Sequence, residues 1–376
     1  MKKFTGQQQE KILALVCGDV KILPPLVVGK LVRAALRALR CQESYGVKAV
    51  LEPDQDELQL LLGKKNASYY PPGERANWKL SALLSINASY GAVKIVGSHS
   101  YNHHLGLPRS TSTILLYDKL SMRPVSIMDG TTLSAQRTGA YASIVIDRLM
   151  QHCETFSVFL FGAGCVANAI IEDLLAHHAD RINTIYVRSR TQKGAETLAA
   201  HFVDRITFPI IAVENLDHLS DCMLVITASN AEAPLFDASQ INSASVILHL
   251  GGNEIPGEWV RYILEKGTVI CDDIASVSHR GSQSLAIFFQ QTGHSLKSMA
   301  EVYQIKNLWQ ILDESTAYPL PALVTCVGLP VLDLYLAQYI YETTPSISSK
   351  PVPSMGTSSH VSKPLFSLMS NKYPPA

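Results

Sequence analysis

A glycine-rich turn stands between an apolar run and a helical pattern near the middle of the 376-residue chain. Residues 158–161 read Val-Phe-Leu-Phe, residues 162–167 read Gly-Ala-Gly-Cys-Val-Ala, and apolar residues then recur at helical spacing. Gly162 permits a tight turn, Gly164 lets a phosphate group approach the backbone, and Ala167 allows the helix to pack closely on the strand. The helix N-terminus adds free N–H groups and a partial positive charge. The turn therefore predicts a site for the pyrophosphate of a dinucleotide, in preference to an ordinary strand–helix turn.

The end of the second strand indicates which dinucleotide is bound. A carboxylate there would hold the ribose 2′-hydroxyl of NAD(H). Residues 186–191 instead read Tyr-Val-Arg-Ser-Arg-Thr, with two guanidinium groups and two hydroxyls that would suit a 2′-phosphate. The sequence favours NADP(H), and NAD(H) stays open if Arg188 and Arg190 are solvated loop charges. The residues expected to contact the cofactor are Gly162, Ala163, Gly164, Cys165, Val166, Ser189, Arg190 and Thr191.

A second block of polar and glycine residues lies upstream, between residues 90 and 142. It contains Lys94 after Gly-Ala-Val, Arg109 after Gly-Leu-Pro, and the sequence Met-Asp-Gly-Thr-Thr-Leu-Ser-Ala-Gln-Arg-Thr-Gly-Ala at 128–140. This block is followed in the sequence by the glycine turn. Together they resemble the ornithine cyclodeaminase/mu-crystallin family, and the resemblance covers most of residues 60–345. The family implies a homodimer whose subunits have a substrate domain and a Rossmann domain, with an α-amino or α-imino acid bound between them.

The resemblance assigns roles to individual residues. Lys94 matches the family's substrate lysine and Arg137 its carboxylate-binding arginine, so both are candidates for catalysis and for substrate binding. A bidentate arginine fixes the carboxylate plane and aims Cα–H at the nicotinamide, while a lysine can hold the carboxylate or shuttle a proton. The family usually has a further basic residue upstream. Lys65 is the first candidate for it, and Lys64 is the second. Thr138 would contact the cofactor phosphates, and Arg109 could meet a second substrate carboxylate.

The loop 249–258, His-Leu-Gly-Gly-Asn-Glu-Ile-Pro-Gly-Glu, bears on the reaction. In the cyclodeaminases that the chain resembles, an aspartate here helps a cycle in which hydride leaves Cα, ammonia departs and the hydride returns. Asn253 falls at that position and would contact the cofactor, but asparagine cannot act as a base at neutral pH. Glu254 is the catalytic candidate if the loop is realigned by one residue.

Further segments resemble one branch of the family. Cys165 and Val166 replace a glutamine that many members carry in the turn, and residues 271–286 and 327–334 look like the dehydrogenases of siderophore and 2,3-diaminopropionate biosynthesis. Those enzymes cleave N-(2-amino-2-carboxyethyl)-glutamate: hydride leaves the glutamate Cα, water adds to the imine, and 2-oxoglutarate and 2,3-diaminopropionate separate. The resemblance thus implies an NAD(P)-dependent oxidoreductase. The alternatives are a cyclodeaminase-type lyase that gives proline and ammonia, a ketimine reductase, and a non-catalytic dinucleotide carrier.

Alternating strands and helices must position these residues. Strands are predicted at 156–161, 183–188, 223–227, 245–250 and 268–271, with helices between most of them, which is typical of a doubly wound parallel sheet. Upstream, the pattern is helical to about residue 60, then gives two strands within 78–99, a strand–turn–strand series at 113–130, and a helix at about 134–150. The predicted fold is α/β: a Rossmann-type sheet plus an α+β domain for substrate binding and dimerisation. We expect residues 1–150, completed by about 320–345, to form the substrate domain, 151–319 the Rossmann domain, and 346–376 a flexible Ser/Pro-rich tail.

The bulk composition excludes several other classes of protein. The 32 basic and 32 acidic residues cancel, which argues against a nucleic-acid-binding surface. No apolar run predicts a membrane span or a signal peptide, and the seven cysteines fit reduced thiols in a cytoplasmic protein without a metal site. His99, with two histidines shortly after it, is interpreted as a loop residue. Asp333 could orient the nicotinamide region, or be a carboxylate on a helix surface.

Overall fold

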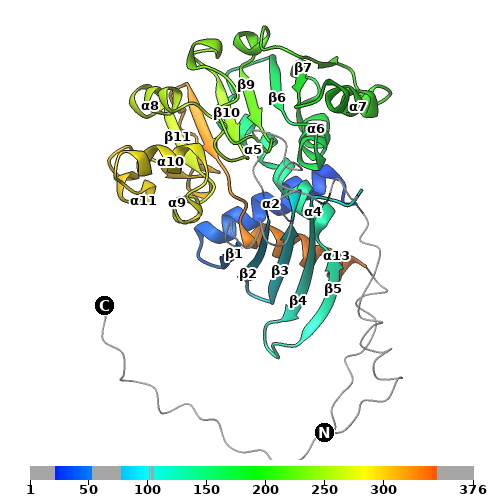
Figure 1. The fold of residues 1–376 in the computed structure, drawn as a ribbon. Coiled ribbons are helices and arrows are strands. Elements are labelled where there is room, and N and C mark those ends of the chain that lie inside the picture. Colours follow the sequence, from blue (N-terminus) through cyan, green and yellow to red (C-terminus); the bar gives the residue numbers. More distant parts are fainter. Residues whose placement is uncertain (1–21, 53–77, 101, 103–105, 345–376) are drawn as a thin grey trace, which may run out of the picture.

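The computed structural model describes residues 22–52, 78–100, 102 and 106–344, which form two sheets with helices around them (Figure 1). The first sheet is antiparallel, in the order β1-β2-β3-β4-β5. Its strands are β1 (Tyr45–Leu51), β2 (Lys79–Ile86), β3 (Tyr90–Ser98), β4 (Ser110–Asp118) and β5 (Pro124–Asp129). Helix α2 (Pro25–Arg40) precedes this sheet, and α4 (Thr131–Gly139) and α5 (Tyr141–Leu149) follow it.

The second sheet is parallel throughout, in the order β12-β11-β13-β10-β9-β6-β7-β8. Its strands are β6 (Phe156–Phe161), β7 (Ile182–Arg188), β8 (Ile210–Ala212), β9 (Leu224–Thr227), β10 (Val246–His249), β11 (Thr268–Cys271), β12 (Lys306–Asn307) and β13 (Ala322–Thr325). The associated helices are α6 (Cys165–His178), α7 (Gln192–Phe202), α8 (Gly257–Lys266), α9 (Ile274–Arg280), α10 (Ser284–Gln291), α11 (Leu296–Met299), α12 (Leu308–Ile311) and α13 (Pro330–Thr343), with short 3-10 turns at Leu219–Asp221 and Ala238–Gln240. Because β6 has β7 on one side and β9 on the other, a crevice forms at the carboxyl ends of β6 and β9.

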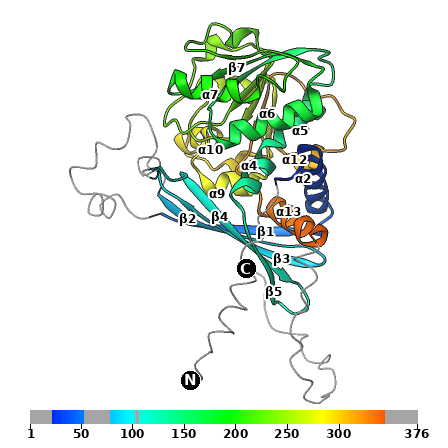
Figure 2. The same cartoon turned by 90° about the vertical axis from the view of Figure 1, so that its right-hand side faces the viewer.

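The antiparallel sheet turns one face toward the parallel-sheet part. Lys48 of β1 pairs with Leu83 of β2, Leu83 with Lys94 of β3, and Lys94 with Ile114 of β4. Directly paired residues in neighbouring strands point to the same face, so these four side chains form one row across the sheet. Leu83, Lys94 and Ile114 are buried, which identifies this as the inner face. Figure 2 shows α4 and α9 at the level between the two sheets, so side chains of both parts can meet there.

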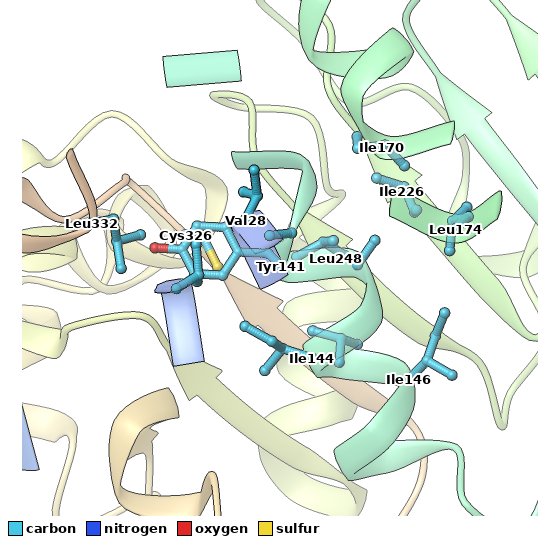
Figure 3. Packing of buried hydrophobic residues seen from close by; sticks show 14 of the residues in the cluster. Val28, Tyr141, Ile144, Ile146, Ile170, Leu174, Ile226, Leu248, Cys326 and Leu332 are labelled. Atoms are coloured by element: carbon cyan, nitrogen blue, oxygen red, sulfur yellow. The ribbon is translucent and has the colours of Figure 1, made fainter. Parts of the chain in front are cut away.

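One hydrophobic core joins the two sheets. Figure 3 shows Tyr141 and Ile144 of α5 beside Leu248 of β10, with Leu332 of α13 close to Cys326. These residues belong to a single cluster of buried side chains that also includes Ile114 of the antiparallel sheet. Helix α13 packs against α2 and against the antiparallel sheet, although β13 just before it lies inside the parallel sheet. The shared core fixes the relative position of the two parts, which a site between them needs.

The predicted α/β class is confirmed, with a doubly wound parallel sheet and a second α+β part. The prediction of helix to about residue 60 is wrong for residues 45–51, which form β1, and the single helix predicted at about 134–150 is two helices. β13 was not predicted. The sequence also has a short apolar run at 58–62 that could form a strand, and it lies outside the described residues. Within the described ranges, no helix is both long and apolar enough to span a bilayer.

Candidate active site

Lys94 and Arg137 meet at one buried carboxylate. Lys94 Nζ lies 2.7 Å from Asp333 Oδ2, and Arg137 Nε lies 3.3 Å from Asp333 Oδ1. Ser134 Oγ accepts a hydrogen bond from Lys94 Nζ at 3.0 Å and one from Arg137 Nη2 at 3.4 Å. The four residues come from β3, α4 and the first turn of α13. The structure therefore brings the two predicted cations together, and Asp333 is a buried partner of both rather than a helix-surface carboxylate.

The cluster carries an excess positive charge in a place with little water. Lys94 and Asp333 are each 1% exposed, and Arg137 is 7% exposed. Two cations and one anion leave a net charge of +1 when all three are ionised. The pKa of Lys94 is lowered to about 8, mainly by burial and also by the charge of Arg137, while Asp333 opposes both effects. An additional carboxylate would balance the remaining charge.

A glycine backbone holds the Arg137 guanidinium in place. Gly328 has a φ of +80°, and a side chain there would come within 2.2 Å of Arg137 Nη1. Asp272 stabilises the turn at Gly328. Its Oδ2 accepts hydrogen bonds from Val327 N at 2.9 Å and Gly328 N at 2.7 Å, and a third from Tyr141 Oη at 3.0 Å. Burial raises the pKa of Asp272 to about 6, against these hydrogen bonds. Asp272 thus acts on the site through the turn that supports Arg137.

A cavity of about 220 Å³ lies between the two parts, next to this cluster. Lys79 and Ser98 line it from the antiparallel sheet, and Thr138, which follows Arg137 in the chain, lines it from α4. The opposite wall includes Gly251 and Arg280. Arg109, Val166 and Ser229 also line the cavity. Lys94 and Arg137 are not among the residues that line this cavity, and both contact Asp333.

A second cavity of about 550 Å³ follows the carboxyl ends of β6, β7 and β9. Its lining includes Gly162, Ser189, Arg190 and Glu214, and it shares Ser229 with the smaller cavity. Glu214 is a carboxylate that the sequence pattern did not assign to this site. Ser229 therefore lies between the two cavities, one beside the arginine-bearing loop after β7 and the other between the sheets.

The geometry of the turn fits a dinucleotide. Gly162 has a φ of +118°, and a side chain there would come within 2.5 Å of the Ala228 carbonyl oxygen, so only glycine suits this position. A side chain at Gly164 would meet nothing within 4 Å, so the backbone at the start of α6 faces open space. Ala167 is fully buried in the core. The residues present thus fit a pyrophosphate at the N-terminus of α6.

Glu254 lies behind the cavity wall. It is fully buried, and its Oε1 accepts a hydrogen bond from Ser229 N at 2.9 Å and a second one from Ser229 Oγ. A side chain at Gly251 would overlap the Glu254 carboxylate. Because Ser229 and Gly251 both line the cavity, Glu254 supports the wall from behind in this geometry. Its catalytic role stays a prediction.

A basic residue of β1, Lys48, lies on the inner face of the antiparallel sheet. Lys65 lies outside the described residues. Lys48 stands in the same row as Lys94, and its pKa is lowered to about 7 by burial and by the charges of Arg280, Lys79, Arg137 and Lys94. Sequence reasoning missed Lys48 because residues 45–51 were expected to be helical.

Other predicted site residues lie around the two cavities. Cys165 lines a third cavity together with Ala163 and Gly164, and this cavity extends to α2. Thr191 caps α7, where its side chain accepts a hydrogen bond from Gly194 N at 3.3 Å. Asn253 points its amide toward the Glu232 carbonyl at 3.5 Å. The His99 ring lies beside that of Trp78, with centroids 5.3 Å apart and the planes tilted by 42°. Among the described residues no group of three or more ligating side chains could hold a metal ion.

Comparison with known proteins identifies the family to which this architecture belongs. A family model of the ornithine cyclodeaminase/mu-crystallin family matches residues 65–348. Alanine dehydrogenase from Archaeoglobus fulgidus is 26% identical over 270 residues, which cover 70% of this chain and 80% of that protein.

Two solved structures share the fold. The Δ1-pyrroline-2-carboxylate reductase of Thermococcus litoralis, in complex with NADH and L-proline, superposes with a TM-score of 0.71 at 20% identity, over 86% of this chain and 94% of that one. An archaeal alanine dehydrogenase dimer with bound NAD gives a TM-score of 0.69 at 19% identity, over 87% and 93%. The family match spans the antiparallel sheet from β2 onward, the whole parallel sheet and α13. The chain belongs to the ornithine cyclodeaminase/mu-crystallin family.

Proposed function

We propose that the protein is an NAD(P)-dependent oxidoreductase that transfers hydride between nicotinamide and the Cα of an amino acid, an imino acid or an N-substituted amino acid. The observation that carries this proposal is the buried Lys94–Asp333–Arg137 cluster, with its net positive charge, near a cavity that borders a dinucleotide-type groove at Ser229. The similar proteins named above, an alanine dehydrogenase and a pyrroline-2-carboxylate reductase, support a reaction at a carbon that bears nitrogen and a carboxylate.

The side chains of the cluster bind and orient the substrate. The α-carboxylate neutralises the net charge that Lys94 and Arg137 carry beyond Asp333, and the Arg137 guanidinium fixes its plane. The nicotinamide supplies or accepts the hydride. Ser229 lines both cavities, Thr138 lines the smaller one, and the lowered pKa of Lys94 lets this residue gain or lose a proton near neutral pH. Because the plane of the carboxylate is fixed, the Cα–H bond of the substrate is oriented toward the nicotinamide.

The finer proposal is the oxidative cleavage of an N-substituted amino acid, in the manner of 2,3-diaminopropionate biosynthesis. Asn253 stands where a cyclodeaminase would have its aspartate, which supports a net dehydrogenase over a lyase. The test is to incubate the protein with N-(2-amino-2-carboxyethyl)-glutamate and NADP⁺ or NAD⁺. We expect reduced nicotinamide, 2-oxoglutarate and 2,3-diaminopropionate in equal amounts. Conversion of ornithine to proline and ammonia without net cofactor change, or tight NADPH binding without turnover of any imino acid, would contradict the proposal.

The arginines after β7 support a preference for NADP(H). Ser189 and Arg190 line the 550 Å³ cavity, while Arg188 Nε donates a hydrogen bond to the Glu214 carbonyl oxygen at 3.1 Å. We predict that Arg190→Ala weakens NADPH binding about tenfold or more and NADH binding less than about twofold, because a guanidinium–phosphate contact is charge-assisted. Fluorescence titration with both cofactors measures this, with the exposed Arg261→Ala on α8 as the control. Equal losses for NADPH and NADH would refute the 2′-phosphate assignment.

Carboxylate binding is expected to take up protons. Lys48 and Lys94 have pKa values of about 7 and about 8 in the free protein, and a bound carboxylate raises both because it favours the charged amine. Uptake is therefore expected at pH 8, where the lysines are partly neutral, and is expected to vanish near pH 6, where both are already protonated. Calorimetric titration with 2-oxoglutarate, in buffers of different ionisation enthalpy, measures the protons exchanged. Identical binding enthalpies in all buffers at pH 8 would contradict this, and Lys48→Met should reduce the uptake.

The outer face of the antiparallel sheet supports a homodimer. Val47, Leu51, Leu80, Leu84 and Ile95 are between 41% and 71% exposed. An apolar face of this kind is unusual on a monomer, and a similar alanine dehydrogenase is a dimer. Sedimentation velocity tests the proposal, since a species at the 41.1 kDa chain mass would refute it and one at twice that mass would support it. A cytoplasmic location stays a prediction.

A further inference from the structure

The cavity between the two sheets has more positive charge than one α-carboxylate needs. Lys79, Arg109 and Arg280 line it, and no aspartate or glutamate is among the described residues that form its wall. The Lys94–Asp333–Arg137 cluster behind the wall has a further net charge of +1. A single carboxylate would balance that cluster, and the rest of the substrate would lie against the wall that Lys79 and Arg280 help to form.

Two of the lining cations approach from opposite sides of the gap. Lys79 is the first residue of β2. It is four residues from Leu83 and therefore points to the same inner face of the antiparallel sheet. Arg280 ends α9, which belongs to the parallel-sheet part. The two charges nevertheless act together, because Arg280 and Lys79 are the strongest charged influences that lower the pKa of Lys48. Cations from both parts therefore converge on the inner face.

The end of α9 is built to hold Arg280 in place. The helix begins at the Asp273 cap, whose carboxylate accepts a hydrogen bond from Ser276 N at 2.7 Å. It ends at Gly281, which has a φ of +63°, so the chain turns away directly after the arginine. The C-terminal end of a helix also favours a cation. Arg280 is thus presented to the cavity by a short helix with defined ends.

Arg109, the third lining cation, forms a hydrogen bond toward the cofactor groove. Its Nη2 donates a hydrogen bond of 2.5 Å to Asn230 Oδ1, and Asn230 lines the dinucleotide groove. Arg109 therefore ties the antiparallel sheet to the cofactor side of the site. This separates it from Lys79 and Arg280.

We propose that Arg280 and Lys79 bind a second carboxylate of the substrate, so that the site selects a dicarboxylic or tricarboxylic amino or 2-oxo acid. The inference rests on the proposed function, in which Lys94 and Arg137 take the α-carboxylate. It deepens that function by naming the residues that set specificity. A side chain ending in an ammonium group, as in ornithine, would face Arg280 and Lys79 and be repelled. The same pair of residues therefore selects against the substrates of a cyclodeaminase.

A binding experiment tests this independently of turnover. 2-Oxoglutarate and 2-oxopentanoate have the same chain length and differ only in the terminal carboxylate. Calorimetry with NADPH-saturated protein should show that 2-oxoglutarate binds at least about tenfold more tightly. Arg280→Gln should remove most of this preference, while the affinities for 2-oxopentanoate and NADPH change less than about twofold. Arg280→Lys keeps the charge without the planar fork and should fall between the two.

The controls separate the possible failures. Arg261→Gln removes an exposed arginine of the same part of the molecule and should leave both affinities unchanged. Thermal unfolding shows whether Arg280→Gln folds, and Lys79→Met gives a second, independent removal of the proposed site. Equal affinity of the native protein for the two acids, or equal losses for both acids and NADPH in the variants, would overturn the inference. Absence of turnover with these preferences intact would overturn the proposed reaction and leave the carboxylate site standing.

Discussion

We expect Asp333→Asn to lower the free energy of unfolding by about 3–5 kcal/mol near neutral pH, because it leaves two buried cations without their anion. Lys94 and Asp333 are almost inaccessible to water, and Arg137 nearly so. The amide can still accept a hydrogen bond but cannot offset the charge. The loss should therefore be much larger than that from removing a surface ion pair, which is about 1 kcal/mol or less.

The pH dependence distinguishes a charge effect from a packing effect. Without Asp333 the pKa of Lys94 should fall below its present value of about 8, whereas in the unfolded chain it is near the ordinary lysine value. Between the folded and unfolded values the unfolded chain binds more protons, so stability rises with pH. This rise begins at a lower pH in the variant than in the native protein, and the deficit should narrow as the pH approaches 8. Urea unfolding at pH 6.5 and 8.5 measures it, with the exposed Asp204→Asn as the control. A deficit below about 1 kcal/mol at pH 6.5, or one that does not change with pH, would contradict the charge argument.

The glycine turn could be predicted from sequence because its requirements are local. Gly162 has a positive φ and lies against the backbone of Ala228, so glycine suits that position, and the backbone at Gly164 faces open space. Strands β6, β7, β9, β10 and β11 were predicted within a residue or two, since they are largely buried apolar runs. The three-residue strand β8 was not predicted. The pairing of Lys94 with Arg137 followed from the family resemblance.

The remaining parts of the site depend on contacts between distant segments. Asp333 binds Arg137 across 196 residues of sequence, so its position on α13 gave no sign of this partner. Lys48 was missed because β1 has apolar residues on its exposed outer face as well, which hides the alternation that marks a half-buried strand. Arg280 reaches the cavity only because α9 lies between the two sheets. The sequence pattern thus located the cofactor groove, whereas the substrate side needed the tertiary structure.

Removal of the Arg137 guanidinium is expected to have the largest effect on activity. Arg137→Ala should reduce kcat/KM by about a thousandfold or more, because the carboxylate loses a charge-assisted hydrogen-bonding partner and its orientation toward the hydride path. Lys94 cannot compensate, since Asp333 then neutralises it alone. The affinity for NADPH should change less than about threefold, because Arg137 does not line the dinucleotide groove. Steady-state kinetics and fluorescence titration measure the two quantities separately.

Two further variants show whether the guanidinium acts by charge or by geometry. Arg137→Lys restores the charge without the fork and should recover only a small part of the activity. Gly328→Ala leaves Arg137 in place chemically but pushes a side chain to within 2.2 Å of its Nη1, so it should also raise KM and lower kcat. Arg123→Ala, on the exposed hairpin between β4 and β5, is the matched control and should be silent. Native activity in Arg137→Ala would remove the basis for the substrate site. Parallel loss of NADPH binding would instead show that the residue supports the fold of the cleft and not the carboxylate.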